Sequence, residues 1–255
     1  MPDLQPVVDR LRAAGCVFAE DEAALLIEAA KTDAQLESLV ERRVAGLPLE
    51  HLLGWAEFRG LRILVGDGVF VPRRRTEFLV ERTAPFLRPG AVVLDLCCGS
   101  GAVGRALAEL ESIELVAADI DLAAVVFAQR NLEPIGGRVF EGDLFDALPA
   151  SLEGRVDILV VNAPYVPTDE IANMPVEARE HEPRLTLDGG SDGLALHRRI
   201  AADAARWLSD DGRVFIETSV RQSSGTARIF EAQGFIAQVA HSDELDGTVV
   251  VAELL

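Results

Sequence analysis

Asp95–Gly104 reads DLCCGSGAVG, in which a short strand pattern passes through glycines into a helical pattern. The glycines follow the spacing Gly99-x-Gly101-x-x-Gly104, and Asp119 lies 20 residues after the first of them. Glycines at a strand-to-helix turn let the backbone approach a ligand, and an acid that ends the next strand accepts hydrogen bonds from ribose hydroxyls. The stretch therefore predicts either a site for an adenosine cofactor, NAD included, or a tight turn that only requires small residues.

Around this stretch, strand patterns alternate with helical ones. We predict seven strands, at Val92–Asp95, Leu115–Asp119, Arg138–Gly142, Ile158–Asn162, Val214–Thr218, Ile236–Ala240 and Val249–Glu253. Helix-like segments follow five of them, which is typical of a parallel sheet covered by helices. The last two strands lie about ten residues apart with no helix between them, so they should pair antiparallel at one end of the sheet.

The residues before the sheet follow other patterns. Apolar residues at helical spacing over residues 3–47 predict three short helices. Asp-Gly within Gly66–Gly68 predicts a hairpin between strands at Leu61–Val65 and Val69–Val71, and a helix should follow over residues 75–87. With boundaries in turns, the predicted division is a helical domain (1–54), a hairpin with a connecting helix (55–90) and an α/β domain (91–255).

Composition narrows the class of protein. The chain has 255 residues, of which 49% are apolar and 26% charged, as in soluble globular proteins. No apolar run is long enough for a membrane span and the N-terminus has no signal-peptide pattern, so we expect a cytosolic protein without a membrane partner. Residues 91–255 hold 28 acidic and 12 basic side chains, and 12 − 28 gives −16. Because only Arg73–Arg75 forms a basic cluster, a nucleic-acid partner is disfavoured.

The cysteines and histidines do not indicate a metal site. Cys97 and Cys98 are adjacent, and with Cys16 they form neither a CxxC pattern nor a disulfide framework, so we expect small buried apolar side chains. The four histidines, His51, His181, His197 and His241, are scattered without the spacing of metal ligands.

Two features after later strands bear on the ligand. Asp143, behind the third strand, can accept a hydrogen bond from an adenine amino group while Leu144 covers a face of the ring; the alternative is that Asp143 caps a helix. Asn162–Tyr165, NAPY, closes the fourth strand, where ligands bind in open α/β sheets. If the Asn162 side chain and the backbone carbonyl of residue 163 accept from an NH2 group, its nitrogen can pyramidalise and present its lone pair to a methyl donor. An ordinary turn would also use such residues.

The sequence resembles the HemK/PrmC family of protein N5-glutamine methyltransferases over most of its length. The segments that carry the resemblance are Gly68–Arg73 with Thr76–Glu77, Asp95–Gly101, Gly142–Phe145, Asn162–Tyr165, Arg179–Leu185, Asp188–Gly190 and Asp192–Leu194. The resemblance implies an α/β fold: a seven-stranded, Rossmann-like class I methyltransferase sheet with a small N-terminal helical domain and a connecting β-hairpin. It favours S-adenosylmethionine over NAD, and it implies methylation of a glutamine in the Gly-Gly-Gln loop of a peptide-chain release factor.

The resemblance also implies roles for individual residues. Those expected to bind the cofactor are Asp95, Cys97, Cys98, Gly99, Ser100, Gly101, Asp119, Asp143, Leu144 and Asn162. Those expected to carry the catalytic chemistry are Asn162, Ala163, Pro164 and Tyr165, where Tyr165 stacks on the planar substrate group. Those expected to bind the substrate are Phe70, Arg73, Glu77, Asn162 and Tyr165. No metal is implied.

Three departures from the family pattern leave alternatives open. Cys97-Cys98 stand where the family usually has a glycine and a small residue, Arg74 replaces a proline, and Ala163 replaces the first proline of the tetrapeptide. Alanine keeps the backbone carbonyl but loses the fixed φ of proline. The alternatives are a divergent paralogue with the same chemistry on a small metabolite or another peptide, or a non-catalytic cofactor-binding interaction protein.

Overall fold

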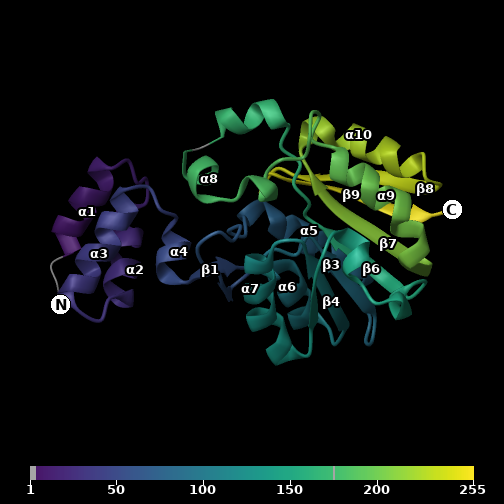
Figure 1. Ribbon diagram of the computed structural model, residues 1–255, viewed down its shortest axis with the longest axis horizontal. Helices are drawn as coiled ribbons and strands as arrows, with labels where there is room; N and C mark the ends of the chain where they lie inside the picture. The colour runs from purple at the N-terminus through teal and green to yellow at the C-terminus, as the bar shows by residue number, and fades with distance from the viewer. Residues whose placement is uncertain (1–3, 175) are drawn as a thin grey trace.

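The computed structural model describes residues 4–174 and 176–255. Its N-terminal part contains the three predicted helices and a fourth: α1 (Leu4–Ala13), α2 (Ala19–Ala29), α3 (Asp33–Val44) and α4 (Leu49–Leu53). Apolar side chains from all four helices form a separate core, and Figure 1 shows this group, coloured purple to blue, toward one end of the molecule. Thr32 accepts a hydrogen bond from the backbone N–H of Gln35, which caps α3 at its N-terminus.

The hairpin lies earlier in the chain than predicted. It joins β1 (Trp55–Phe58) to β2 (Leu61–Leu64) through Arg59 and Gly60, both of which have positive φ, 51° and 75°. Two positive-φ residues between antiparallel strands form the turn that best matches strand twist. Val69–Val71 is therefore not a strand. The chain does turn at Gly66–Gly68, where the N–H of Val69 bonds Gly66 O at 3.1 Å, but the prediction that this turn joins two hairpin strands is wrong.

Contacts with the α/β part explain this difference. A Cβ at Gly66 would lie 2.5 Å from the Phe127 ring, so this glycine permits close packing. The side chain of Asn131 bonds the backbone N–H and carbonyl of Leu64, at 2.9 and 3.0 Å. The hairpin is thereby anchored on α7 (Leu122–Leu132).

The predicted connecting helix is present, with a 3-10 turn at each end. It comprises the 3-10 turn η1 (Arg74–Thr76), α5 (Glu77–Thr83) and the 3-10 turn η2 (Ala84–Phe86). Its buried side chains Phe78, Leu79 and Val80 pack against the sheet, in the same cluster as Val93.

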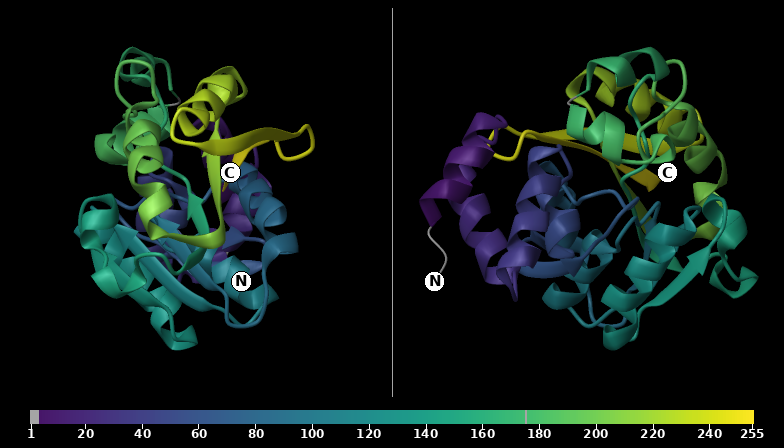
Figure 2. Two further views of the ribbon diagram at one scale, coloured as in Figure 1. Left: turned by 90° about the vertical axis from the view of Figure 1, so that its right-hand side faces the viewer. Right: turned by 60° about the vertical axis from the view of Figure 1, so that its left-hand side comes forward.

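The seven predicted strands all form one sheet. They are β3 (Val92–Leu96), β4 (Glu114–Asp119), β5 (Arg138–Glu141), β6 (Val156–Val161), β7 (Leu208–Thr218), β8 (Phe235–Ser242) and β9 (Gly247–Leu254). Their order is β5-β4-β3-β6-β7-β9-β8; the first five are mutually parallel, and β9 is antiparallel to both β7 and β8. The last hairpin lies at one edge, as predicted, and projects as a yellow ribbon in Figure 2.

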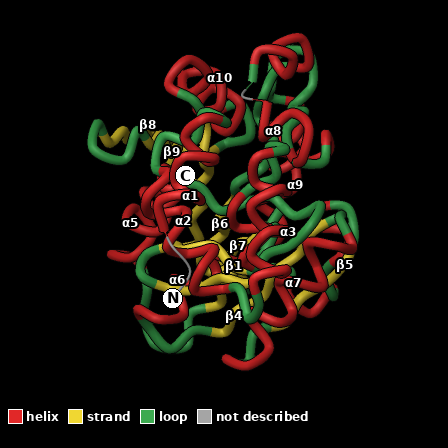
Figure 3. The backbone as a smooth tube through the Cα atoms, turned by 90° about the vertical axis from the view of Figure 1, so that its left-hand side faces the viewer, coloured by secondary structure: helices red, strands yellow, loops and turns green. Residues whose placement is uncertain are grey.

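Helices cover both faces of the sheet, which explains why its strands are apolar on both sides. Val93 packs on the face covered by α5, α6 (Ala102–Leu110) and α7, whereas Leu94 and Leu96 pack on the face covered by α9 (Ala195–Trp207) and α10 (Val220–Glu231). Figure 3 marks the alternation of strand and helix along the backbone. The segment after β5 contains only two 3-10 turns, η4 (Leu144–Ala147) and η5 (Ala150–Leu152).

The long connection after β6 folds back on itself. It contains η6 (Thr168–Asn173), α8 (Val176–His181) and η7 (Arg184–Thr186). The backbone N–H of Val166 bonds Leu187 O at 3.0 Å, and that of Gly189 bonds Val166 O at 2.8 Å. Both ends of the loop therefore lie beside Asn162–Tyr165. No helix within residues 4–174 and 176–255 has the length and apolar character to cross a membrane.

Candidate active site

A cavity of about 500 Å³ opens at the carboxyl ends of the parallel strands, where the order reverses between β3 and β6. Ligands bind at such switch points in open α/β sheets, and the volume is that of a small-molecule site. Most of the predicted residues line it: Phe70, Arg73, Asp95, Cys97, Cys98, Gly99, Ser100, Asp119, Asp143, Leu144, Asn162, Ala163, Pro164 and Tyr165.

Two predicted residues lie outside the described lining of this cavity. Gly101 precedes α6 with φ 78°, and a Cβ there would lie 2.9 Å from the Leu132 side chain, so this glycine lets α6 and α7 pack closely. Glu77 begins α5, one residue after Thr76, which does line the cavity.

The loop after β3 turns through backbone conformations that favour glycine. Gly99 has φ 54°, and a Cβ there would meet no atom within 4 Å, so the space above it is open to a ligand. Cys97 adopts φ 59° without being glycine, which is a strained position. Asp95 accepts a hydrogen bond from the N–H of Gly104 at 2.8 Å; its burial raises its pKa to about 7, against the lowering effect of that bond.

Asp119 ends β4 and fixes the same loop. One carboxylate oxygen accepts from the N–H of Gly99 at 2.8 Å and the other from the N–H of Asp121 at 2.9 Å. Burial raises the pKa of Asp119, although these backbone bonds oppose the shift. A carboxylate in this place can accept further bonds from ribose hydroxyls of a ligand.

The cysteines behave as small apolar side chains. Cys98 is buried and Cys97 half-buried, and burial together with Asp119 raises the pKa of both thiols well above its ordinary value. The thiols therefore stay protonated, and they are poor nucleophiles in that form.

Asp143 and Leu144 follow β5, the strand next to β4, and line the cavity on the same side as Asp119. Asp143 forms an ion pair with Arg199 of α9 at 2.9 Å, and its side chain makes no capping hydrogen bond to η4. The alternative of a helix cap is therefore not supported. Leu144 is buried and has φ 51°, which places a bulky apolar residue in an unusual backbone conformation at the cavity wall.

The Asn162 side chain is oriented by a residue that does not belong to the sheet. Its Nδ2 donates to Oγ1 of Thr76 at 3.3 Å. Within residues 4–174 and 176–255, no group donates to Asn162 Oδ1 or to the backbone carbonyl of Ala163. Two acceptors at the cavity therefore remain available to an NH2 group.

Tyr165 is held by a buried acid that the sequence patterns did not single out. Its hydroxyl donates to Glu217 Oε1 at 3.2 Å, and Glu217 is 2% exposed near the end of β7. Burial and the Glu217 charge raise the pKa of Tyr165, while burial also raises the pKa of Glu217. An acid near the carboxyl end of a predicted strand was a usable signal for Glu217.

The segment before α5 forms another wall. Arg73 lies over the Phe70 ring, with 5.1 Å from guanidinium carbon to ring centroid, and pairs with Glu182 of the long loop. Burial raises the pKa of Glu182, which the Arg73 charge opposes. Thr76, Arg75 and Arg199 also line the cavity. Arg75 stood out in the sequence only as part of the basic cluster and Thr76 only through the family resemblance, and no pattern indicated Arg199.

Comparison with known proteins agrees with this geometry. The family model described as methyltransferase small domain matches residues 62–180. A release factor glutamine methyltransferase of Geobacter sulfurreducens is 39% identical over 205 residues, which cover 79% of this chain and 71% of the relative.

Solved structures share the fold. A methyltransferase from Pyrococcus furiosus matches with a TM-score of 0.59 and 18% identity, covering 77% of this chain and 90% of that one. A T. thermophilus 16S rRNA N2 G1207 methyltransferase in complex with AdoMet and guanosine matches with a TM-score of 0.53 and 25% identity, covering 79% of this chain and 50% of that one.

Proposed function

Because the chain belongs to the release factor glutamine methyltransferase family, we propose that it methylates a glutamine side-chain amide of a peptide-chain release factor, with S-adenosylmethionine as donor. The observation that carries the proposal is the orientation of Asn162: its NH2 is engaged by Thr76, while its oxygen and the Ala163 carbonyl remain acceptors. A cytosolic location, as expected from the sequence, is where such a substrate would be met.

The cavity fits this cofactor. The open space over Gly99 admits a ligand to the loop, and Asp119 would accept from its ribose hydroxyls. Asp143 and Leu144 would hold the adenine, and the acidic lining suits a cationic ligand. Bound there, S-adenosylmethionine supplies a methyl group activated by a sulfonium centre.

The chain's own residues would activate the acceptor. An amide nitrogen is a weak nucleophile because its lone pair is delocalised into the carbonyl. Asn162 Oδ1 and the Ala163 carbonyl would accept from both N–H bonds and localise that lone pair, while Tyr165 would fix the plane of the amide by stacking. The nitrogen would then bond to the methyl carbon as the carbon–sulfur bond breaks, and solvent would take a proton from the resulting cationic N-methylated amide, which is strongly acidic.

Mass spectrometry tests this proposal. Release factors carrying the Gly-Gly-Gln loop would be incubated with the protein and S-adenosylmethionine, digested and sequenced. We expect one methyl group on the glutamine side chain, added about 10²–10³-fold more slowly by Asn162→Ala. An unmodified glutamine in every release factor tried would overturn the proposed substrate.

A second substrate class is favoured by Ala163. This residue is 1% exposed at the position where the family usually has proline, and Arg74 departs from the pattern in the neighbouring wall segment. These changes favour the same chemistry on another peptide or a small metabolite. Transfer of labelled methyl to a protein-free cell extract, without label on release factors, would identify this case.

A further inference from the structure

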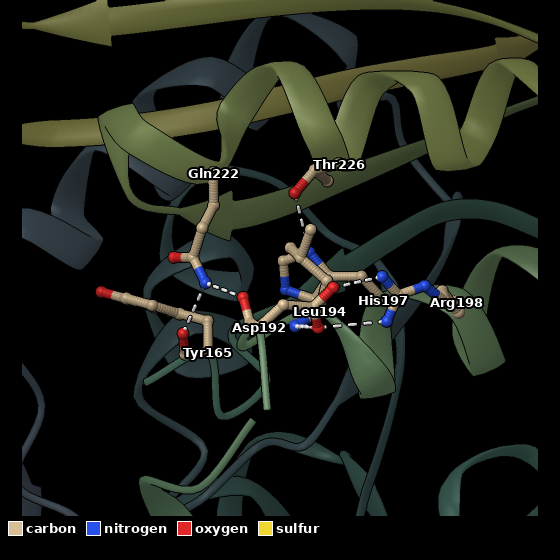
Figure 4. A network of polar contacts seen from close by, with 7 residues as sticks. All are labelled: Tyr165, Asp192, Leu194, His197, Arg198, Gln222 and Thr226. Carbon is tan, nitrogen blue, oxygen red and sulfur yellow. Dashed lines mark hydrogen bonds and ion pairs between the residues drawn. The ribbon is translucent and has the colours of Figure 1, made fainter. Parts of the chain in front are cut away.

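Gln222 joins α10 to the residues that form the acceptor side of the cavity. Its side-chain NH2 donates to the backbone carbonyl of Tyr165 at 2.8 Å and to that of Asp192 at 3.0 Å (Figure 4). Gln222 as a whole is 7% exposed. One buried amide therefore ties the end of the Asn162–Tyr165 tetrapeptide to the point where the long loop returns.

Helix capping does not account for this arrangement. Ser219 and Gln222 have the spacing of a capping box, in which the second side chain bonds back to the first residue's backbone N–H. Here Ser219 Oγ accepts from the N–H of Gln222 and donates to Gln222 Oε1 at 2.5 Å. Ser219 caps α10 and holds the Gln222 amide so that both of its N–H bonds are directed at the loop.

The loop passes this amide so closely that no side chain fits at Gly193. A Cβ at Gly193 would lie 2.1 Å from Gln222 Nε2 and 2.2 Å from the Tyr165 carbonyl oxygen, and Gly193 has φ 72°. Only glycine lets the returning loop pass here. Among the described residues, the Tyr165 carbonyl accepts from Gln222 alone.

Tyr165 is thus fixed at two points. Gln222 holds its carbonyl and Glu217 holds its hydroxyl, from the helix and the strand that adjoin each other in sequence. We infer that Gln222 is a positioning residue, which sets the orientation of the Tyr165 peptide and so of the ring that receives the acceptor amide. The expected effect on kcat rests on the proposed function, whereas the expected effect on the geometry of the Tyr165 peptide does not.

The structural consequence can be measured at a single atom. Tyr165 is the only tyrosine among the 255 residues, so growth on tyrosine labelled with ¹³C at the carbonyl carbon places one label on the bond that accepts from Gln222. We expect Gln222→Met, which keeps a long side chain and removes the donors, to move this resonance upfield. The matched control is Gln233→Met at an exposed site, which should leave it unchanged.

The kinetic consequence separates positioning from mere stability. The fraction of folded Gln222→Met protein is counted by S-adenosylmethionine binding, whose affinity should stay unchanged. Per bound site, kcat should fall by about 10- to 100-fold, as for a misplaced substrate group. If Gln222→Met folds poorly, Gln222→Glu takes its place, because glutamate keeps the acceptor for Ser219 and removes the donors. We expect the same fall in kcat for this variant.

The outcomes distinguish this inference from the proposed function. An unmoved carbonyl resonance, or a wild-type kcat per folded site, overturns the positioning role. Wild-type protein that methylates no release factor overturns the proposed substrate and leaves the resonance test standing.

Discussion

The Asn162 side-chain nitrogen lies 3.3 Å from the Thr76 hydroxyl oxygen, although 86 residues separate the two in the chain. Asn162 ends the central part of the sheet, whereas Thr76 belongs to the turn that leads into α5 before the sheet begins. The segment before the α/β part therefore decides which end of the Asn162 amide is left for a substrate.

Removing the Thr76 hydroxyl should loosen Asn162. We expect Thr76→Val to lower kcat by about 3- to 10-fold, the effect of one neutral hydrogen bond of roughly 1 kcal/mol. Thr76→Ser keeps the hydroxyl and should keep the rate. Single-turnover methyl transfer measures both, and equal rates for the valine and serine variants would refute the orienting role.

Removing the Asn162 amide should have a larger effect. Asn162→Ala is expected to lower kcat by about 10²–10³-fold, as for loss of one preorganised polar contact to a transition state. Cofactor affinity should change less, because Asn162 acts mainly on the acceptor. A variant with the wild-type single-turnover rate would show that the tetrapeptide is only a turn.

Asp119→Ala should weaken S-adenosylmethionine binding. The variant loses the acceptor for ribose hydroxyls and the bond from Gly99 that shapes the loop, about 1.5–3 kcal/mol for each hydrogen bond to a charged group at most. Titration calorimetry measures the affinity, with the exposed Asp211→Ala as control. NAD should bind neither protein; NAD binding without S-adenosylmethionine binding would contradict the cofactor assignment.

The single tyrosine makes the Glu217 contact measurable by absorbance. The Tyr165 hydroxyl should ionise above its ordinary pKa because it is buried and faces the Glu217 charge. Glu217→Gln removes that charge, so the pKa of Tyr165 should fall while burial keeps it elevated. A pH titration of tyrosinate absorbance, with circular dichroism recorded in parallel to exclude unfolding, checks this. An unchanged midpoint would show that the two groups do not interact.

Asp95 should make stability depend on pH. Its folded-state pKa is about 7, against an ordinary value of 3.8, so the folded protein binds more protons between these values. The free energy of unfolding contributed by this group therefore decreases as pH rises from about 4 to about 7. Asparagine does not titrate, so the free energy of unfolding of Asp95→Asn relative to wild type should increase as pH rises across this window. Denaturant unfolding of both proteins measures it. The same shift with exposed Asp211→Asn would point to another cause.

The positions of the seven strands and the glycine loop could be predicted because local patterns specify them. The strand runs are apolar on both faces, and the turn after β3 needs residues that tolerate positive φ. The hairpin could not be placed this way. Both Arg59-Gly60 and Asp67-Gly68 could join the strands of a hairpin, and only contacts from Asn131 and Phe127, about 60 to 70 residues away in the chain, select between them.

For the same reason, sequence reasoning could not tell which polar residues contact the tetrapeptide. Thr76, Glu217 and Gln222 reach Asn162 and Tyr165 across 86, 52 and 57 positions. No local pattern records such a meeting. Ser219-x-x-Gln222 would even be interpreted as a helix cap, because its side-chain bonds to the loop depend on the assembled fold.

The reversal of strand order at the cavity has an evolutionary consequence. Asp119 ends β4 and Asp143 follows β5 on one side of β3. On the other side, Asn162 follows β6 and Glu217 lies in β7. In the proposed function, the carboxylates assigned to the donor's ribose and adenine therefore lie on one half of the sheet, and the groups assigned to the acceptor amide lie on the other. Drift in one half, such as the exchange of proline for Ala163, can broaden the range of acceptors while selection on the other half preserves the donor.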